Sequence, residues 1–222
     1  MTKKLKLMLL CGDGGGDAIA IIKAINANVL KNCEITCLLA ESENKLLSYF
    51  KASNAPKSIK TYKSGSKASA LDALQKQIDV DKPDYVFLAG FKFILPESFL
   101  TQSVRFINTH HSLLPAFKGL FNKEFLVSQD ISLLGHTIHY VSKEVDEGKQ
   151  IAQFAFPNFG MENFEKILKT YRLGADVLNL TVLQSLESKD SYNRPMKFSY
   201  EHLVFSLPID EEVLNFAISI QD

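Results

Sequence analysis

The chain has 222 residues, of which 46% are hydrophobic and 23% are charged, as in an ordinary soluble globular protein. This length is enough for one domain, or one domain with an appendage, to bury a core without disulfide bonds or a structural metal. Twenty-five Lys and Arg residues balance twenty-five Asp and Glu residues, so the net charge gives no reason to expect a nucleic-acid or membrane partner.

The cysteines and the amino-terminal segment indicate a cellular compartment. Cys11, Cys33 and Cys37 are the three cysteines, and no second Cys or His pair follows them at zinc-binding spacing. We therefore expect buried free thiols and no metal. The apolar run near the amino end is too short for a secretion signal, and no run approaches the roughly 18 apolar residues of a membrane span. These features predict a cytoplasmic protein.

Strand-like runs and helical patterns alternate over the first half of the sequence. Alternation of this kind predicts an α/β fold with a doubly wound, mainly parallel sheet and helices on both faces. The predicted strands are residues 4–10, 34–39, 57–62 and 85–89, and the predicted helices are residues 18–27, 44–52 and 68–80.

A glycine-rich turn separates the first predicted strand from the first predicted helix. Glycines let a backbone approach an anion, and a helix amino terminus offers unpaired N–H groups. The sequence matches neither common phosphate-loop pattern, and its two carboxylates would repel a phosphate unless they turn away. An alternative is that Asp17 only caps the helix. The segment that we expect to contact a substrate consists of Gly12, Asp13, Gly14, Gly15 and Gly16.

A polar cluster follows two apolar runs in the centre of the chain. The first run ends at Gly90 and the second at Asn108, and His110, His111 and Ser112 come directly behind. Ligands of open α/β sheets bind at the carboxyl ends of strands. An amide and imidazoles there could supply an oxyanion donor and a proton-transfer group for reactions at a carbonyl carbon. A polar turn closed by Pro115 is the alternative interpretation.

The second half of the chain continues with further elements and ends in a tail of different character. We expect a helix, two strands, a long helix and two strand-like pieces at residues 122–129, 135–141, 151–156, 164–186, 196–200 and 202–207. The predicted domains are a catalytic domain of residues 1–190 and a C-terminal extension of residues 191–222. The extension is expected to form a short β-hairpin-like appendage, which is a candidate element for homodimer formation.

Three motifs lie in a fixed order over about residues 84–156. They are Leu88-Ala89-Gly90-Phe91, Asn108-Thr109-His110-His111-Ser112-Leu113-Leu114-Pro115, and Gly135-His136-Thr137-Ile138-His139 leading to Asp146-Glu147-Gly148. In this order and at this spacing they resemble the folate-dependent formyltransferase family. Within the family the sequence is most similar to phosphoribosylglycinamide formyltransferases (glycinamide ribonucleotide transformylases), with sugar N-formyltransferases as relatives.

The resemblance implies transfer of a formyl group from 10-formyltetrahydrofolate to a primary amine, without a metal. It places Asn108, His110 and Asp146 at the catalytic positions. Asn108 would donate to the developing oxyanion, His110 would donate a second bond or a proton, and Asp146 would orient the imidazole and accept a proton. His139 is expected to be structural rather than catalytic. The cofactor-binding residues implied by the resemblance are Lys92, Phe93, Ile94, Leu95, Val141 and Asp146.

Departures from the family pattern concern the amine substrate. His111 stands where the family usually has proline, either as a substrate contact or as a tolerated turn residue. The glycine-rich segment lacks the usual Ser-Asn pair, and Phe121-Asn122 replace His-Thr; Lys169 or Arg172 could pair with an anion instead.

The resemblance therefore implies a small phosphorylated amine as substrate, with glycinamide ribonucleotide of purine biosynthesis first and a nucleotide-linked amino sugar second. Initiator tRNA is a less favoured substrate, because the chain is short and carries no net positive charge. A different class of function, a catalytically silent folate- or nucleotide-binding module, remains an alternative. Hydrolysis of formyl-folate is a further minor option.

Overall fold

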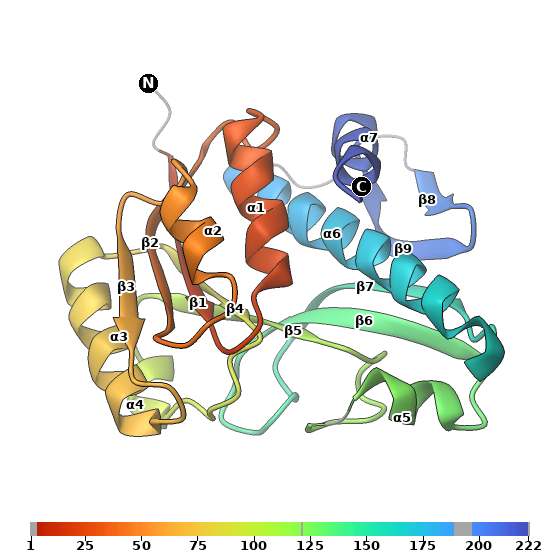
Figure 1. Cartoon of the computed structure of the whole chain (residues 1–222), viewed down its shortest axis with the longest axis horizontal. Coiled ribbons are helices and arrows are strands. Elements are labelled where there is room, and N and C mark those ends of the chain that lie inside the picture. Colours follow the sequence, from red (N-terminus) through yellow and green to blue (C-terminus); the bar gives the residue numbers. More distant parts are fainter. Residues whose placement is uncertain (1–3, 121, 189–196, 222) are drawn as a thin grey trace. The chain divides into compact units, whose positions relative to one another are not determined.

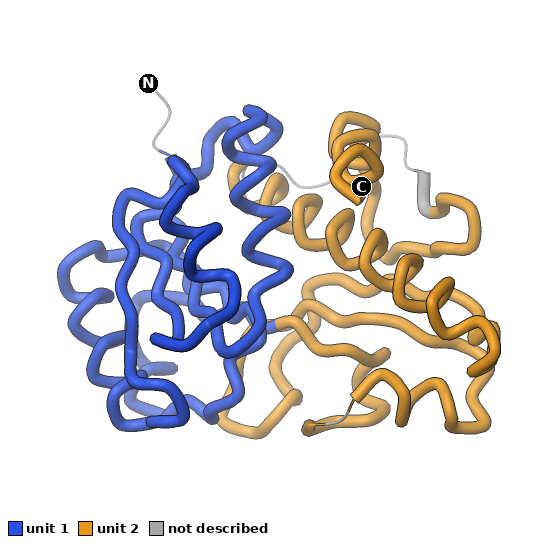
Figure 2. Tube along the Cα trace, viewed as in Figure 1, with its two compact units in different colours: residues 1–108 blue, residues 109–222 orange. Residues whose placement is uncertain are grey.

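The computed structural model describes residues 4–120, 122–188 and 197–221. The chain divides into two compact units, residues 1–108 and residues 109–222 (Figure 2). The strand β5 (Arg105–His110) runs across the boundary, so it ends unit 1 and begins unit 2.

Unit 1 is a parallel α/β arrangement. Its strands are β1 (Leu5–Cys11), β2 (Cys33–Glu41), β3 (Ile59–Tyr62), β4 (Tyr85–Ala89) and the first part of β5, in the order β3-β2-β1-β4-β5 with every pair parallel (Figure 1). Leu7 to Cys11 are fully buried, which explains why this strand reads as a continuous apolar run. The helices of unit 1 are α1 (Gly16–Asn26), α2 (Leu47–Ala52), α3 (Lys67–Asp81) and α4 (Glu97–Leu100).

Unit 2 is antiparallel beyond β5. The strands β6 (Leu133–Tyr140), β7 (Gln150–Pro157), β9 (Leu203–Ile209) and β8 (Lys197–Tyr200) pair in that order. The long helix α6 (Phe164–Ser188) lies along β6, β7 and β9 (Figure 1). The remaining elements are α5 (Lys123–Ser128), the 3-10 turn η1 (Met161–Asn163) and α7 (Glu211–Ser219). The parallel pairs of unit 1 and these helices confirm the mainly parallel α/β fold predicted from the sequence.

Polar side chains determine where several helices begin. Ser66 caps α3 by accepting the N–H of Ser69, and Asn122 caps α5 by accepting the N–H of Phe125 at 2.7 Å. The alternative role for Asp17 is wrong, because α1 begins at Gly16 and its cap is Gly15 without a side-chain hydrogen bond. Gly15 has a φ of 132°, which favours glycine at this position.

The tail contains the expected hairpin. The two strand-like pieces predicted there are β8 and β9, which pair antiparallel. The proposed domain boundary between residues 190 and 191 lies outside the described residues, and that division stays a prediction, as does a role of the hairpin in dimerisation.

We predict that Gly12→Ala destabilises the protein. A Cβ at Gly12 would clash with the carbonyl oxygen of Gly90, so that the ends of β1 and β4 would have to separate. Overpacking of this kind costs about 1–3 kcal/mol. Urea unfolding measures the change.

Gly14→Ala is the matched control, because a Cβ there meets nothing within 4 Å. We expect its stability to stay within about 0.5 kcal/mol of the wild type. Equal losses in both variants would contradict the steric explanation.

Candidate active site

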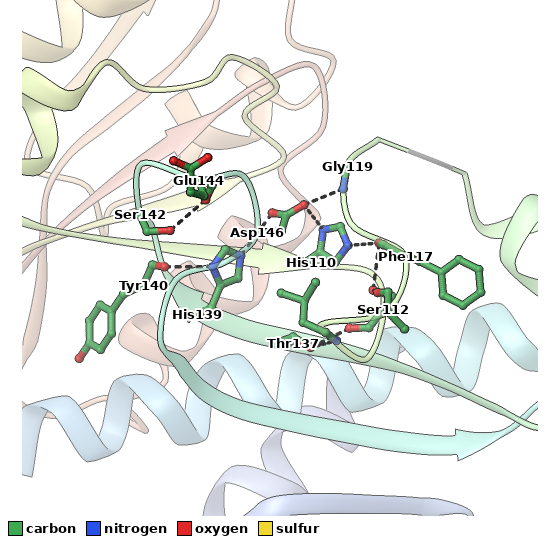
Figure 3. Close-up of polar contacts among 12 residues, drawn as sticks. His110, Ser112, Phe117, Gly119, Thr137, His139, Tyr140, Ser142, Glu144 and Asp146 are labelled. Carbon is green, nitrogen blue, oxygen red and sulfur yellow. Dashed lines mark hydrogen bonds and ion pairs between the residues drawn. The ribbon is translucent and has the colours of Figure 1, made fainter.

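His110 is the last residue of β5, and its side chain is only 8% exposed. Its Nε2 lies 2.7 Å from the carbonyl oxygen of Phe117 (Figure 3). Because a carbonyl oxygen only accepts, Nε2 carries the hydrogen and donates. Nδ1 is therefore the nitrogen without a hydrogen in the neutral ring, and it faces Oδ2 of Asp146 at 3.4 Å.

Asp146 lies in the loop between β6 and β7, and its side chain is 9% exposed. Oδ2 accepts the N–H of Gly119 at 2.8 Å, and Oδ1 lies 3.6 Å from Nε2 of His139. The backbone of Asp146 is left-handed, with a φ of 56°. A non-glycine residue in this region costs about 1–2 kcal/mol, so the surrounding contacts hold the carboxylate in place against local strain.

His139 completes the group on the other side of Asp146. Its Nδ1 lies 3.0 Å from the carbonyl oxygen of Tyr140 and must donate to it. Burial lowers the pKa of His139, which favours the neutral ring with Nε2 toward Asp146. Since His110 and His139 each donate their other N–H to a carbonyl, the two nitrogens that face Asp146 are acceptors in the neutral rings. The three side chains can thus share an incoming proton.

The loop after His110 is attached firmly to β6 and β7. Oγ1 of Thr137 donates to the carbonyl of Ser112 at 2.7 Å and accepts from the N–H of Leu114 at 3.0 Å and from Nε2 of Gln153 at 2.9 Å (Figure 3 draws the first two). Gln153 also donates to the carbonyl of Leu114 at 3.0 Å. These bonds fix the loop that supplies both the Phe117 carbonyl and the Gly119 N–H.

Asn108, the third predicted catalytic residue, lies two positions before His110 on β5. Residues two apart on a strand share a face, so both side chains leave the same face of β5. Asn108 pairs in register with Leu88 of β4 and is half-buried.

The glycine-rich segment of unit 1 holds contacts that sequence reasoning did not predict. Nζ of Lys92, a predicted cofactor residue, lies 2.6 Å from Oδ2 of Asp13, a predicted substrate residue. The hydrogen bond from Lys92 lowers the pKa of Asp13. The buried Asn44 donates to the carbonyls of Gly12 and Gly14, the latter at 2.6 Å. The only sequence signal for Asn44 is its place in the polar turn after β2.

The remaining predicted cofactor residues lie in different environments. Phe93 is half-buried, with its ring 5.5 Å from that of Phe91. Ile94 is 59% exposed, Leu95 is buried in the core, and Val141 is half-buried.

Of the residues considered for the amine substrate, His111 is exposed and lies 5.4 Å from the ring of His136. Arg172 pairs with Asp176 at 2.8 Å. Phe121 lies outside the described residues.

The described residues provide neither a cluster of metal ligands nor a membrane-spanning helix. Residues 4–120, 122–188 and 197–221 contain no group of three His, Cys, Asp or Glu side chains placed to hold a metal ion. None of the helices in these ranges is both long and apolar enough to cross a membrane.

A carboxylate between two imidazoles, beside the end of β5, is an arrangement that can exchange protons. The sequence matches the formyl transferase family over residues 5–175. The chain therefore belongs to the formyl transferase family, which confirms the resemblance seen in its motifs.

Individual relatives carry different names. The chain is 28% identical to the formyltetrahydrofolate deformylase of Haemophilus influenzae over 69% of its own length, and 31% identical to the trifunctional purine biosynthetic protein adenosine-3 of Bos taurus over 58%. These matches span 54% and 13% of the two relatives, so the chain covers about half or less of their length.

Solved structures cover more of the chain. The phosphoribosylglycinamide formyltransferase of Brucella melitensis has a TM-score of 0.72 and 28% identity, covering 84% of this chain and 97% of that one. The enzyme of the same name from Anaplasma phagocytophilum also has a TM-score of 0.72, with 27% identity and coverage of 84% and 89%.

We predict that His136 makes the folded protein less stable in acid. Burial lowers the pKa of His136 well below 6.5, so the unfolded chain binds a proton near that pH that the folded chain does not. His136 therefore leaves the free energy of unfolding unchanged above about pH 6.5 and lowers it as the pH drops further, by up to about 1.4 kcal/mol per pH unit. Urea unfolding at about pH 7.5 and 5 measures the slope. His136→Phe keeps a ring against Phe154 and should flatten the slope; an unchanged slope would contradict the assignment.

Proposed function

We propose that this protein transfers a formyl group from 10-formyltetrahydrofolate to the primary amine of a small phosphorylated substrate. The observation that carries the proposal is the placement of Asp146 between His110 and His139, at 3.4 and 3.6 Å. Membership of the formyl transferase family supports the reaction class. The proposed catalytic residues are Asn108, His110 and Asp146, and His139 joins them as a residue that faces the same carboxylate.

The proposed reaction begins when the amine nitrogen attacks the formyl carbon. The new C–N bond produces a tetrahedral oxyanion, for which the amide of Asn108 is the proposed donor. One such donor is typically worth about 3 kcal/mol of the barrier. A protonated His110 adds positive charge at the same strand end.

Proton transfer completes the reaction. The attacking amine becomes positively charged and must lose a proton. Asp146, with His110 and His139 beside it, accepts this proton directly or through water. When the bond from the formyl carbon to N10 of the folate breaks, N10 takes the proton and tetrahydrofolate leaves. The acid–base group thus returns to its starting state. Donation of His110 Nε2–H to the Phe117 carbonyl keeps Nδ1 as the atom that holds or releases the proton toward Asp146.

Glycinamide ribonucleotide is the first candidate acceptor. Several solved structures at 26–28% identity are phosphoribosylglycinamide formyltransferases, which supports this choice. A nucleotide-linked amino sugar is the alternative. The segment from Gly12 to Gly16 is a proposed substrate contact, with Lys92 to Leu95 and Val141 proposed at the folate. A cytoplasmic location stays a prediction, in keeping with the three free, buried cysteines.

Hydrolysis of formyltetrahydrofolate is a second candidate function. The similarity to the Haemophilus influenzae deformylase favours it, and water could replace the amine at the same carbon. Asp146 and its two histidines would then activate the water. A non-catalytic folate-binding module is disfavoured, because His110 and Asp146 retain a geometry suited to proton transfer.

We predict that Asp146→Asn lowers turnover at least a hundredfold, because an amide cannot accept the proton that the amine releases. The measurement is the rate of tetrahydrofolate release, and binding of a non-hydrolysable folate analogue should change much less. Glu147→Gln is the matched control: this neighbouring carboxylate is exposed and pairs with Lys118 at 2.7 Å. An Asp146→Asn enzyme with near-normal turnover would rule out this carboxylate as the base.

The acceptor assay separates the candidate functions. Tetrahydrofolate release from 10-formyltetrahydrofolate is measured without an amine, with glycinamide ribonucleotide, and with a panel of nucleotide-linked amino sugars. We expect release to depend on an amine and to yield the formylated product by mass spectrometry. Release of free formate at the same rate without any amine would establish the deformylase function instead, and no release in any mixture would favour the silent module.

A further inference from the structure

Unit 2 holds a second group of basic and aromatic side chains, which we call the His111 cluster: His111, Lys123, His136 and Tyr171. The His111 ring lies 5.4 Å from the ring of His136 and 5.6 Å from that of Tyr171, in an edge contact with the latter. Nζ of Lys123 lies 4.8 Å from the centroid of the Tyr171 ring. His111 is exposed, whereas His136 is fully buried and Tyr171 is buried.

The hydrogen-bond chain within the cluster determines which nitrogen of neutral His111 carries the hydrogen. The Tyr171 hydroxyl donates its one hydrogen to the carbonyl of Gly135 at 2.7 Å. Its oxygen, 3.2 Å from Nδ1 of His136, must then accept from that nitrogen. Nδ1 of His136 therefore carries the hydrogen, and Nδ1 of His111, 3.4 Å away, faces it as an acceptor. Neutral His111 consequently carries its hydrogen on Nε2.

Burial lowers the pKa of His136, and the charge of Lys123 is among the interactions that lower it further. Arg172, on α6, is engaged by Asp176 at 2.8 Å. A tyrosine ring holds the Lys123 ammonium without cancelling its charge. The exposed His111 and the Lys123 ammonium thus both contact the Tyr171 ring, and an N–H donor and an ammonium are the groups that bind an anion.

We propose that the His111 cluster is a binding site for a phosphate-type oxyanion, with the Nε2–H of His111 and the Lys123 ammonium as its donors. Resting on the proposed function, the anion is the phosphate group of the amine that accepts the formyl group. The glycine-rich segment is a poorer place for that group, because the carboxylate of Asp13 is already paired with Lys92 there and would repel a phosphate.

Inorganic phosphate is the first probe, titrated into the full-length protein and followed by calorimetry. We expect saturable binding that weakens about tenfold or more in Lys123→Met and in His111→Gln. Lys166→Met is the matched control, because Lys166 lies 4.1 Å from the centroid of the Phe159 ring on the same unit. The Lys166→Met variant loses the same charge and the same kind of contact as Lys123→Met, yet it should bind phosphate like the wild type. No saturable binding to the wild type, or equal weakening in all three variants, would overturn the proposal.

Thermal unfolding and folate-analogue binding serve as folding controls for the variants. If one of the two variants unfolds early, the other alone decides the test. If both variants unfold early, the wild-type protein is labelled with diethylpyrocarbonate with and without phosphate. We expect phosphate to protect His111 from labelling, and equal labelling in the two reactions would overturn the proposal.

The source of the phosphate group is tested by kinetics. Lys123→Met should raise KM for the phosphorylated amine about tenfold, while kcat and the KM for 10-formyltetrahydrofolate stay within about twofold. If Lys123→Met has the same KM for the phosphorylated amine as the wild type, the assignment of the anion to that amine is overturned and free phosphate remains as the ligand. If no amine is formylated but phosphate binding still depends on Lys123 and His111, the proposed function fails and the anion site stands.

Discussion

The arrangement on which the site depends is the Asp146 carboxylate between the rings of His110 and His139. Each ring is fixed from behind, because each donates its other N–H to a backbone carbonyl, of Phe117 and of Tyr140. A carbonyl cannot donate, so neither ring can reverse its tautomer without losing a hydrogen bond. The tautomers of the two rings that face Asp146 are therefore set by main-chain atoms.

Holding this arrangement requires local strain, and the fold offsets it with hydrogen bonds. Asp146 and Phe117 both have left-handed backbones, with φ of 56° and 53°, a conformation that costs about 1–2 kcal/mol for a residue with a Cβ. The Gly119 N–H ties the Asp146 carboxylate to the loop after β5, and Thr137 ties that loop to β6. Strain at residues that carry the chemistry, compensated by neighbours that do not, is a common feature of functional sites.

The sequence predicted the parts of the fold that depend on local pattern. β4 was predicted to the residue, because a short apolar run between a proline and a glycine has few alternatives. Proximity of His110 to Asp146 followed only from the family motif, since no local pattern brings together a strand end and a distant loop. The Lys92–Asp13 pair and the contacts of Asn44 were missed because they depend on how β1, β2 and β4 lie side by side. The alternative that Asp17 caps α1 was wrong, because the cap is Gly15, and glycine at a positive φ leaves no side-chain signal.

The two basic regions of unit 2 differ in what a change of residue would do. Around Asp146, the tautomers of the two histidines follow from backbone carbonyls. Around His111, the donor follows from a chain of side chains, Tyr171 to His136 to His111. Replacement of any one of them redirects or removes that donor without touching Asp146. Under the two proposals above, the residues of the reaction and the residues that recognise the acceptor are different, so each set can be substituted without the other.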